Sequence, residues 1–155
     1  MKKSKSSKDK LFGWNSVTDE FGDKYLTRIF IWRLRLHIFH RGDDDPDCHD
    51  HPWGFYTFPF NSYWEEVLEE IEGEYKIISN VVTRFRWHYR PATYCHRVVG
   101  PLNTKRKKII TLVWREAFQR KWGFKVVCSP NKIDWIYWRE YLWGGGKEKA
   151  CQDDG

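Results

Sequence analysis

The sequence predicts an all-β domain, a sandwich or a barrel built from many short strands. Aromatic residues favour strands, and they make up 18 % of the 155 residues, ten of them Trp. Short alternating or apolar segments follow one another at close spacing, with turn-forming residues between them. A chain of this length can also bury a core of its own as one domain.

The two ends of the chain differ in composition from the segment between them. Residues 1–12 are rich in Lys and Ser and predict a disordered basic tail. Three consecutive glycines open the polar segment 144–155, which predicts a flexible C-terminal tail. Residues 13–143 contain neither a repeat nor a linker, so we expect them to form a single domain.

The segment from Tyr25 to His40 shows the alternation of a strand. Every second residue of Leu34–Ile38 is apolar, and every second residue of Arg33–His37 is basic. In a barrel with a wet interior the basic set would face inward, whereas in an ordinary surface strand it would face solvent. The sequence leaves both orientations open.

The remaining strands follow an acidic turn, Gly42–Asp47, whose composition is typical of loops. Pro52 favours an extended backbone at His51, and Glu72–Glu74 predicts a hairpin turn. The last segment, Ile133–Leu142, fits either a short helix or a final strand. The strands predicted after the turn cover residues 54–60, 63–71, 74–78, 81–88, 95–99, 108–116 and 122–128.

Positive charge is concentrated at the N-terminus. The net charge is +6, and five Lys against one Asp in the first ten residues contribute most of it. Lys105–Lys108 forms a second basic group. Such a tail can hold nucleic-acid phosphates, but we favour a solubilising extension over nucleic-acid binding.

Four cysteines, Cys48, Cys95, Cys128 and Cys151, show neither zinc-knuckle nor thioredoxin spacing, and they predict reduced thiols. There is no apolar run long enough to span a bilayer, and the N-terminus lacks the apolar stretch of a signal peptide. We therefore expect a soluble, intracellular, cytoplasmic protein.

Three histidines predict a metal site. His49 and His51 are two residues apart, so on an extended strand both point to the same face. His96, from a distant strand, would supply a third imidazole. Three protein ligands of this kind suit Fe, Cu, Ni or Zn and leave positions open for water, substrate or dioxygen. The alternative is that these histidines hold loops by hydrogen bonds, with Asp47 and Asp50 as partners.

Further residues could complete this site. Asp47 shares the parity of the two histidines, so it could be a direct metal ligand, a partner that orients an imidazole, or part of the solvated turn. His37 could be a general base or a half-buried strand residue. Tyr56 could place a phenol near the metal or pack in the core, and the same holds for Tyr94.

The histidines also carry a resemblance to a known family. His49-x-His51 resembles the first motif of the cupin superfamily, G-x5-H-x-H-x3,4-E-x6-G, and Pro91 and His96 keep the spacing of its second motif. The Glu of the first motif would fall at Phe55 or Tyr56 and is absent. The chain further resembles small phage and bacterial cupin-like proteins that share His-Asp-His-Pro-Trp.

The resemblance implies a cupin-like double-stranded β-helix, a jelly-roll barrel, with a short C-terminal helix or strand. Its three-His sites imply a mononuclear non-haem iron oxygenase or dioxygenase that uses Fe(II) and acts on a small molecule. It also implies a homodimer, and the phage likeness would place the protein in a host cytoplasm. Because neutral ligands do not offset the charge of the metal, we expect an anionic substrate.

Two other functions stay open at this point. The first is a hydrolase, isomerase or lyase that uses Zn, Mn or Ni as a Lewis acid, with His37 or Asp47 as base. The second is a non-catalytic metal- or ligand-binding module, associated with phage particles or nucleic acid.

Overall fold

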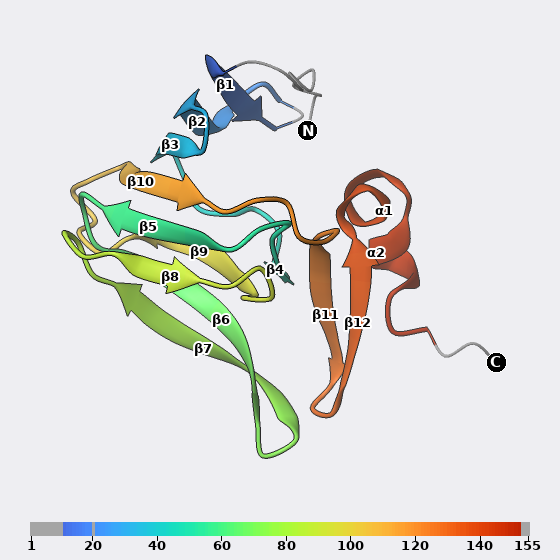
Figure 1. Ribbon diagram of the computed structural model, residues 1–155. Helices are drawn as coiled ribbons and strands as arrows, with labels where there is room; N and C mark the ends of the chain where they lie inside the picture. The colour runs from blue at the N-terminus through green and yellow to red at the C-terminus, as the bar shows by residue number, and fades with distance from the viewer. Residues whose placement is uncertain (1–10, 20, 153–155) are drawn as a thin grey trace.

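The computed structural model describes residues 11–19 and 21–152, so the predicted basic tail lies almost entirely outside the described residues. Over these residues the chain forms two antiparallel sheets and two short C-terminal helices (Figure 1). The first sheet has the strand order β1-β2-β3-β10-β5-β8, and the second has the order β12-β11-β4-β9-β6-β7. This is the all-β, cupin-like double-stranded β-helix that the sequence predicts.

The bounds of the elements are as follows. The first sheet contains β1 (Phe12–Thr18), β2 (Lys24–Ile31), β3 (Leu34–Phe39), β5 (Phe55–Pro59), β8 (His88–Arg90) and β10 (Ile109–Arg115). The second sheet contains β4 (Cys48–His49), β6 (Tyr63–Ile71), β7 (Glu74–Val82), β9 (His96–Pro101), β11 (Gly123–Ser129) and β12 (Lys132–Tyr137). The helices are α1 (Trp138–Trp143) and α2 (Gly146–Lys149). No helix of the described residues has the length and hydropathy needed to cross a membrane.

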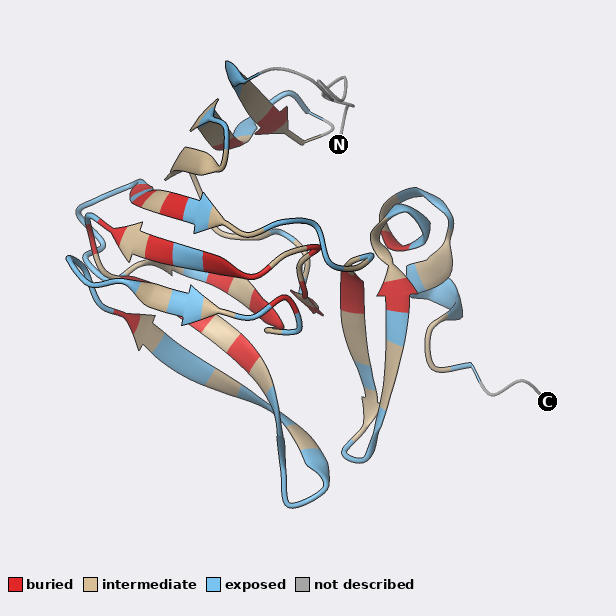
Figure 2. Ribbon diagram, in the orientation of Figure 1, coloured by how far each residue is buried: buried red, intermediate tan, exposed pale blue. Residues whose placement is uncertain are grey.

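The core lies between the sheets, where strands from both contribute buried side chains. Tyr63, Val82, Val98 and Ile109 form one cluster that joins β6, β7 and β9 of the second sheet to β10 of the first. Figure 2 shows buried residues along the middle strands of both sheets, while the β6–β7 hairpin projects into solvent. Its turn was predicted correctly: Glu72 and Gly73 both have positive φ, 54° and 81°, as a two-residue hairpin turn requires.

Of the basic set Arg33, Arg35 and His37, whose orientation the sequence left open, only His37 lines the cavity between the sheets. Arg28, His37 and Thr111 line a cavity between the two sheets. The opposite face of the same sheet is apolar and borders a shallow outer hollow, lined by Leu34, Tyr56, Trp87, Leu112 and Trp114. On this wall the barrel interior therefore carries polar residues among apolar ones such as Leu26, Phe39 and Val113.

Several predicted strands have different bounds in the structure. Residues 25–40 are not one strand but the hairpin β2–β3, reversed at Trp32, whose φ is 51°. This turn contains none of the usual turn residues, so composition does not reveal it. The predicted strands 74–78 and 81–88 are replaced by the continuous β7 and the short β8. Residues 133–142 contain both alternatives, since β12 leads directly into α1.

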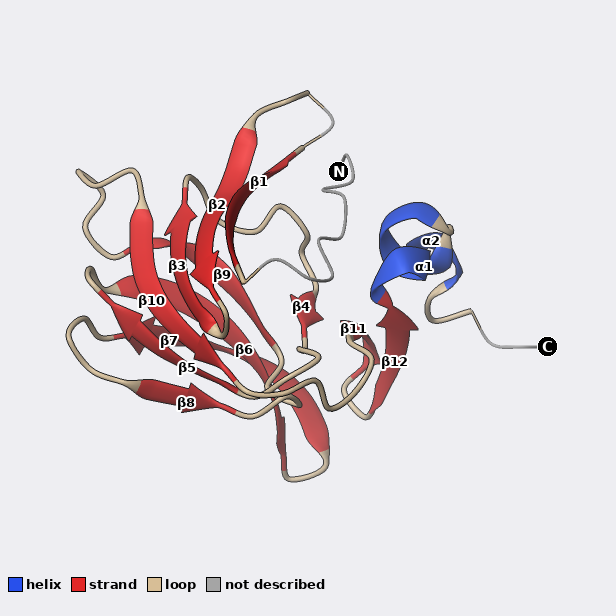
Figure 3. Cartoon of the chain, turned by 45° about the horizontal axis from the view of Figure 1, so that its top comes forward, coloured by secondary structure: helices blue, strands red, loops and turns tan. Residues whose placement is uncertain are grey.

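The C-terminal segment corrects two predictions. Cys128 and Cys151 form a disulfide, whereas the sequence predicted reduced thiols; Cys48 and Cys95 are free, as expected. The segment 144–152, predicted as a flexible tail, contains α2, and Ala150 packs against the cluster around Phe124. Figure 3 shows both helices beside the β11–β12 hairpin. The cysteines become neighbours only because α1 turns the chain back, which their spacing does not show.

Candidate metal centre

The second sheet brings the three histidines together. His49 in β4 is the direct cross-strand partner of His96 in β9, and His51 follows two residues after His49. The ring centroids lie 5.1 Å apart for His49 and His51, 5.3 Å for His49 and His96, and 5.0 Å for His51 and His96. One ligand atom from each ring lies within 4.8 Å of the others. The three residues could therefore hold a metal ion, as predicted.

A buried carboxylate orients one of these rings. His96 Nδ1 lies 2.8 Å from Glu65 Oε2, and the Glu65 side chain has no exposed surface. An imidazole that donates its Nδ1 proton to a carboxylate has its Nε2 lone pair free to bind a metal. Glu65 therefore fixes the ring in the tautomer that a metal ligand needs.

Glu65 is held as an anion by several donors. Its Oε1 accepts hydrogen bonds from Arg90 at 2.8 Å, Tyr94 at 2.6 Å and Asn80 at 3.0 Å. Burial by itself raises the pKa of this carboxyl group, but the contacts with His96, Arg90 and Tyr94 outweigh it and lower the pKa to about 2. Tyr94 thus acts on the site through Glu65.

The other two rings are partly buried, and their pKa values are lowered. Burial lowers the pKa of His49 to about 4 and that of His51 well below its ordinary value. His51 Nδ1 is buried and has no hydrogen-bond partner among the described residues. A buried nitrogen without a partner costs free energy unless something binds it, so this donor set fits a metal ion.

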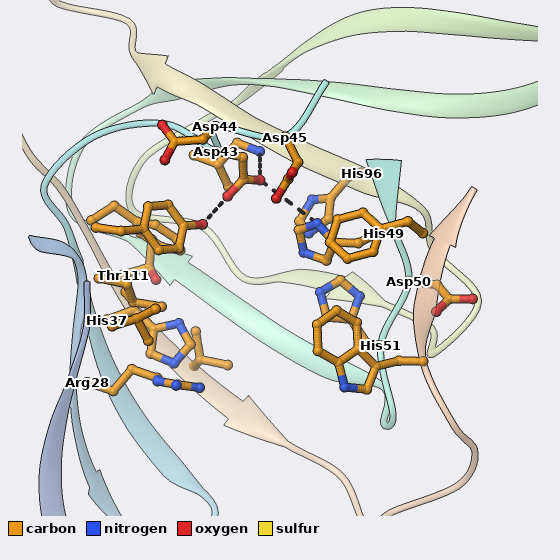
Figure 4. A pocket seen from close by; sticks show the side chains of 18 of the residues that line it. Arg28, His37, Asp43, Asp44, Asp45, His49, Asp50, His51, His96 and Thr111 are labelled. Carbon is orange, nitrogen blue, oxygen red and sulfur yellow. Dashed lines mark hydrogen bonds and ion pairs between the residues drawn. The ribbon is translucent and has the colours of Figure 1, made fainter. Parts of the chain in front are cut away.

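Asp50, between the two ligand positions, points away from the site and anchors the segment (Figure 4). Its carboxylate accepts hydrogen bonds from Arg120 at 2.7 Å, from the backbone N–H of Gly123 at 2.8 Å and from Trp135 Nε1 at 2.9 Å. A side chain at Gly123 would come within 2.1 Å of the Ile136 carbonyl oxygen, so glycine allows this close approach of β11 and β12. Asp50 thereby ties His49 and His51 to the next hairpin.

The histidines face a cavity of about 360 Å³ between the sheets. This volume suits a small molecule. Apolar rings lie beside the histidines. The ring centroid of Phe55 is 4.7 Å from that of His51, and the centroids of Trp122 and Phe124 are 6.0 and 5.9 Å from that of His49. The histidines therefore have apolar rings beside them, and the carboxylate of Asp43 lies 3.9 Å from His49 Nδ1.

The remaining predicted site residues have different positions. His37 lines the cavity on the opposite wall. Asp47 also lines it, but it is outside the group whose ligand atoms converge, and its Oδ2 accepts a hydrogen bond from Tyr141 at 2.7 Å. Tyr56 is not near the metal centre: it lies on the outer face of the first sheet, where its ring is tilted against that of Tyr89 with the centroids 4.8 Å apart.

Two functional carboxylates escaped the sequence analysis. Glu65 has the parity of the buried residues Tyr63 and Val67 in β6, and an acidic residue on a buried face is a signal that could have identified it. Asp43 was interpreted as turn chemistry, but its Oδ2 accepts from the Val98 backbone at 2.7 Å and lies 3.9 Å from His49 Nδ1. Asp43 makes these contacts with Val98 and His49 only because the acidic turn folds back against β9.

Fold and site together define a cupin-like barrel with a candidate three-histidine metal centre. No protein-family model matches the chain, and neither does any curated protein sequence. Among solved structures, the Fe(II) form of HppE is similar at 6 % identity over 68 % of this chain and 56 % of that one, with a TM-score of 0.49. CENP-C from Drosophila melanogaster, solved bound to CAL1, is similar at 12 % identity over 68 % and 81 % of the two chains, with a TM-score of 0.48.

A third similar structure is CapF from Staphylococcus aureus, at 14 % identity over 84 % of this chain and 34 % of CapF, with a TM-score of 0.48. The matched region therefore spans just over half of HppE and about a third of CapF. The function is argued below from the site itself. The likeness to phage proteins stays a prediction.

Proposed function

We propose that this protein is a mononuclear non-haem iron enzyme that oxidises a small molecule with dioxygen. The observation that carries the proposal is the convergence of three imidazoles, those of His49, His51 and His96, on a cavity of about 360 Å³. Three imidazoles suit Fe(II) and leave coordination positions for dioxygen and a substrate atom. When bound, the iron would supply the redox chemistry.

The residues of this chain supply orientation and exclusion of water. Glu65 holds the proton on His96 Nδ1, and Asp50 holds the segment that carries His49 and His51. Phe55 and Phe124 cover the imidazoles on the cavity side. A site held this rigidly needs little reorganisation when a metal binds.

A Lewis-acid hydrolase or isomerase with Zn, Mn or Ni is less well supported, because it needs a base in the cavity. Burial, together with the charges of Arg28 and Arg35, lowers the pKa of His37 to about 3, so His37 is a poor proton acceptor at neutral pH. Asp47 is engaged by Tyr141. Neither candidate base is therefore well suited to the role.

The test is metal analysis of anaerobically purified protein, loaded with Fe(II) or Zn(II) in parallel. We expect about one ion per chain, and oxygen consumption only with iron and a reactive small molecule. His49→Ala and His96→Ala should lose the ion. His88→Ala, at a partly buried histidine outside the site, is the matched control and should keep it. Unchanged metal content in both site variants would contradict the proposal, and turnover without oxygen would favour the Lewis-acid alternative.

A further inference from the structure

The wall opposite the three histidines carries a second polar group, formed by one row of residues across the first sheet. Arg28 in β2, His37 in β3 and Thr111 in β10 are direct neighbours in register, and all three line the cavity. In Figure 4 they lie together on one side of the cavity, and His49, His51 and His96 lie on the other. A molecule that fills the cavity would contact both walls.

This row has unused hydrogen-bonding capacity. The Nε of Arg28 donates to Asn15 at 3.1 Å, but among the described residues no carboxylate lies within ion-pair distance of its guanidinium group. The His37 Nε2 is buried and has no partner there either. A buried cation and a buried imidazole nitrogen are both costly when unpaired. Their cost would fall if a ligand supplied acceptor atoms and negative charge.

More arginines lie at the rim of the same wall. Arg35 and Arg115 both stack on Trp53, with Cζ 5.4 and 5.0 Å from the ring centroid, and Trp53 lines the cavity. The Nε atoms of both arginines are buried without partners among the described residues. Burial lowers the pKa of Arg35 to about 10, and the nearby charges of Arg115 and Arg28 add to this effect, as repulsion between like charges does. An anion between them would relieve this repulsion.

We propose that Arg28, His37 and Thr111 form a subsite for an oxyanion group of the substrate, a carboxylate or a phosphate, while the other end of the substrate reaches the three histidines. Arg28 supplies the charge and two guanidinium nitrogens, and the His37 imidazole and the Thr111 hydroxyl each supply a hydrogen bond. Arg35 and Arg115 contact Trp53, which lines the same cavity. The claim that the bound molecule is a substrate rests on the proposed enzyme function. The claim that the subsite binds an anion does not rest on it.

The test uses metal-free full-length protein, so it does not depend on the metal centre. Sodium phosphate and sodium butyrate are titrated separately at constant ionic strength, and heat of binding is recorded. We expect saturable binding of at least one probe, and the preferred probe identifies phosphate or carboxylate. Arg28→Gln should weaken it by about tenfold or more, as loss of a charged hydrogen-bond donor does. The exposed Arg139→Gln variant is the matched control and should change affinity less than about twofold.

A second measurement does not require a variant at Arg28 to fold. The ring nitrogen resonances of His37 should shift as the probe binds, and those of His88, which does not line the cavity, should not. Absence of saturable binding by both probes, equal affinity in folded Arg28→Gln, or binding that leaves His37 unshifted would each overturn the subsite. Fe(II) content measured in parallel separates the two proposals, because Arg28→Gln should still bind one ion per chain.

Discussion

The two walls of the cavity differ in how their charges are balanced. On the second sheet, the carboxylates of Glu65 and Asp50 are surrounded by hydrogen-bond donors, and they hold the residues of the metal site in place. On the first sheet, Arg28 and Arg35 are cations with no carboxylate partner among the described residues. The charges on the second-sheet wall are balanced within the protein, whereas the arginines of the first-sheet wall lack a counter-charge. We call the second-sheet wall, which carries the three histidines, the metal wall, and the first-sheet wall, which carries Arg28, the arginine wall. We infer that the residues of the metal wall pre-organise it, and that the arginine wall needs a ligand to balance its charge.

The largest expected effect comes from neutralising the anion behind the metal wall. Glu65→Gln leaves Arg90 buried without its counter-ion and removes the acceptor that orients His96. Breaking such a buried pair from one side costs about 3–5 kcal/mol of unfolding free energy. Metal affinity should also fall by about 10- to 100-fold. Urea unfolding and Fe(II) titration measure the two effects.

The neighbouring residue gives the control for this variant. Glu66 pairs with Arg97 at 2.5 Å, but both side chains are partly exposed. Glu66→Gln should therefore cost less than about 1 kcal/mol and leave metal affinity unchanged. Equal effects at the two positions would show that the metal wall does not depend on Glu65.

The anchor on the outer side of the metal wall should matter less. Asp50→Asn weakens the contacts with Arg120 and Trp135 and the acceptor for Gly123, and we expect a loss of about 1.5–3 kcal/mol in unfolding free energy. Metal affinity should fall as well, because His49 and His51 flank this residue. A destabilised variant with unchanged metal affinity would show that the anchor serves the fold alone.

The arginine wall predicts a pH dependence of stability. The pKa of His37 in the folded protein is about 3, below the value of about 6.5 for an unfolded chain. Between these values the unfolded chain takes up a proton that the folded protein does not, so stability falls as the pH falls. From pH 7 to pH 5 this contribution amounts to about 2 kcal/mol. Because His49 and His51 add losses of the same sign in both proteins, the native protein should lose about 2 kcal/mol more than His37→Gln over this range in unfolding curves; equal losses in both would contradict the assignment.

The smallest expected effects concern Asp47. Tyr141→Phe removes the hydrogen bond to Asp47 and should cost about 1 kcal/mol, with no change in metal content. Asp47→Asn should leave Fe(II) affinity within about twofold. A tenfold loss in Asp47→Asn would instead make this carboxylate a metal ligand and give the metal wall a negative charge.

Local patterns predicted much of the fold and the centre of the site. The alternation in Arg33–His37 and the hairpin turn at Glu72 are local signals, and the structure confirms both the strand and the turn. The convergence of His49 and His51 follows from their spacing on an extended backbone. The reversal at Trp32 was missed, because a Trp with positive φ carries no turn signal in its composition.

The sequence by itself determined an all-β barrel, two histidines on one face and a distant third as their partner. Tertiary structure decided the rest. Only the pairing of β4 with β9 places His96 opposite His49, and only the packing of β6 brings Glu65 to His96. Only closure of the barrel decides that the polar face of the first sheet points inward, so that Arg28 shares a cavity with the three histidines. The physical reason is that strand periodicity defines two faces but not which of them is buried, and burial depends on the sheet that packs opposite.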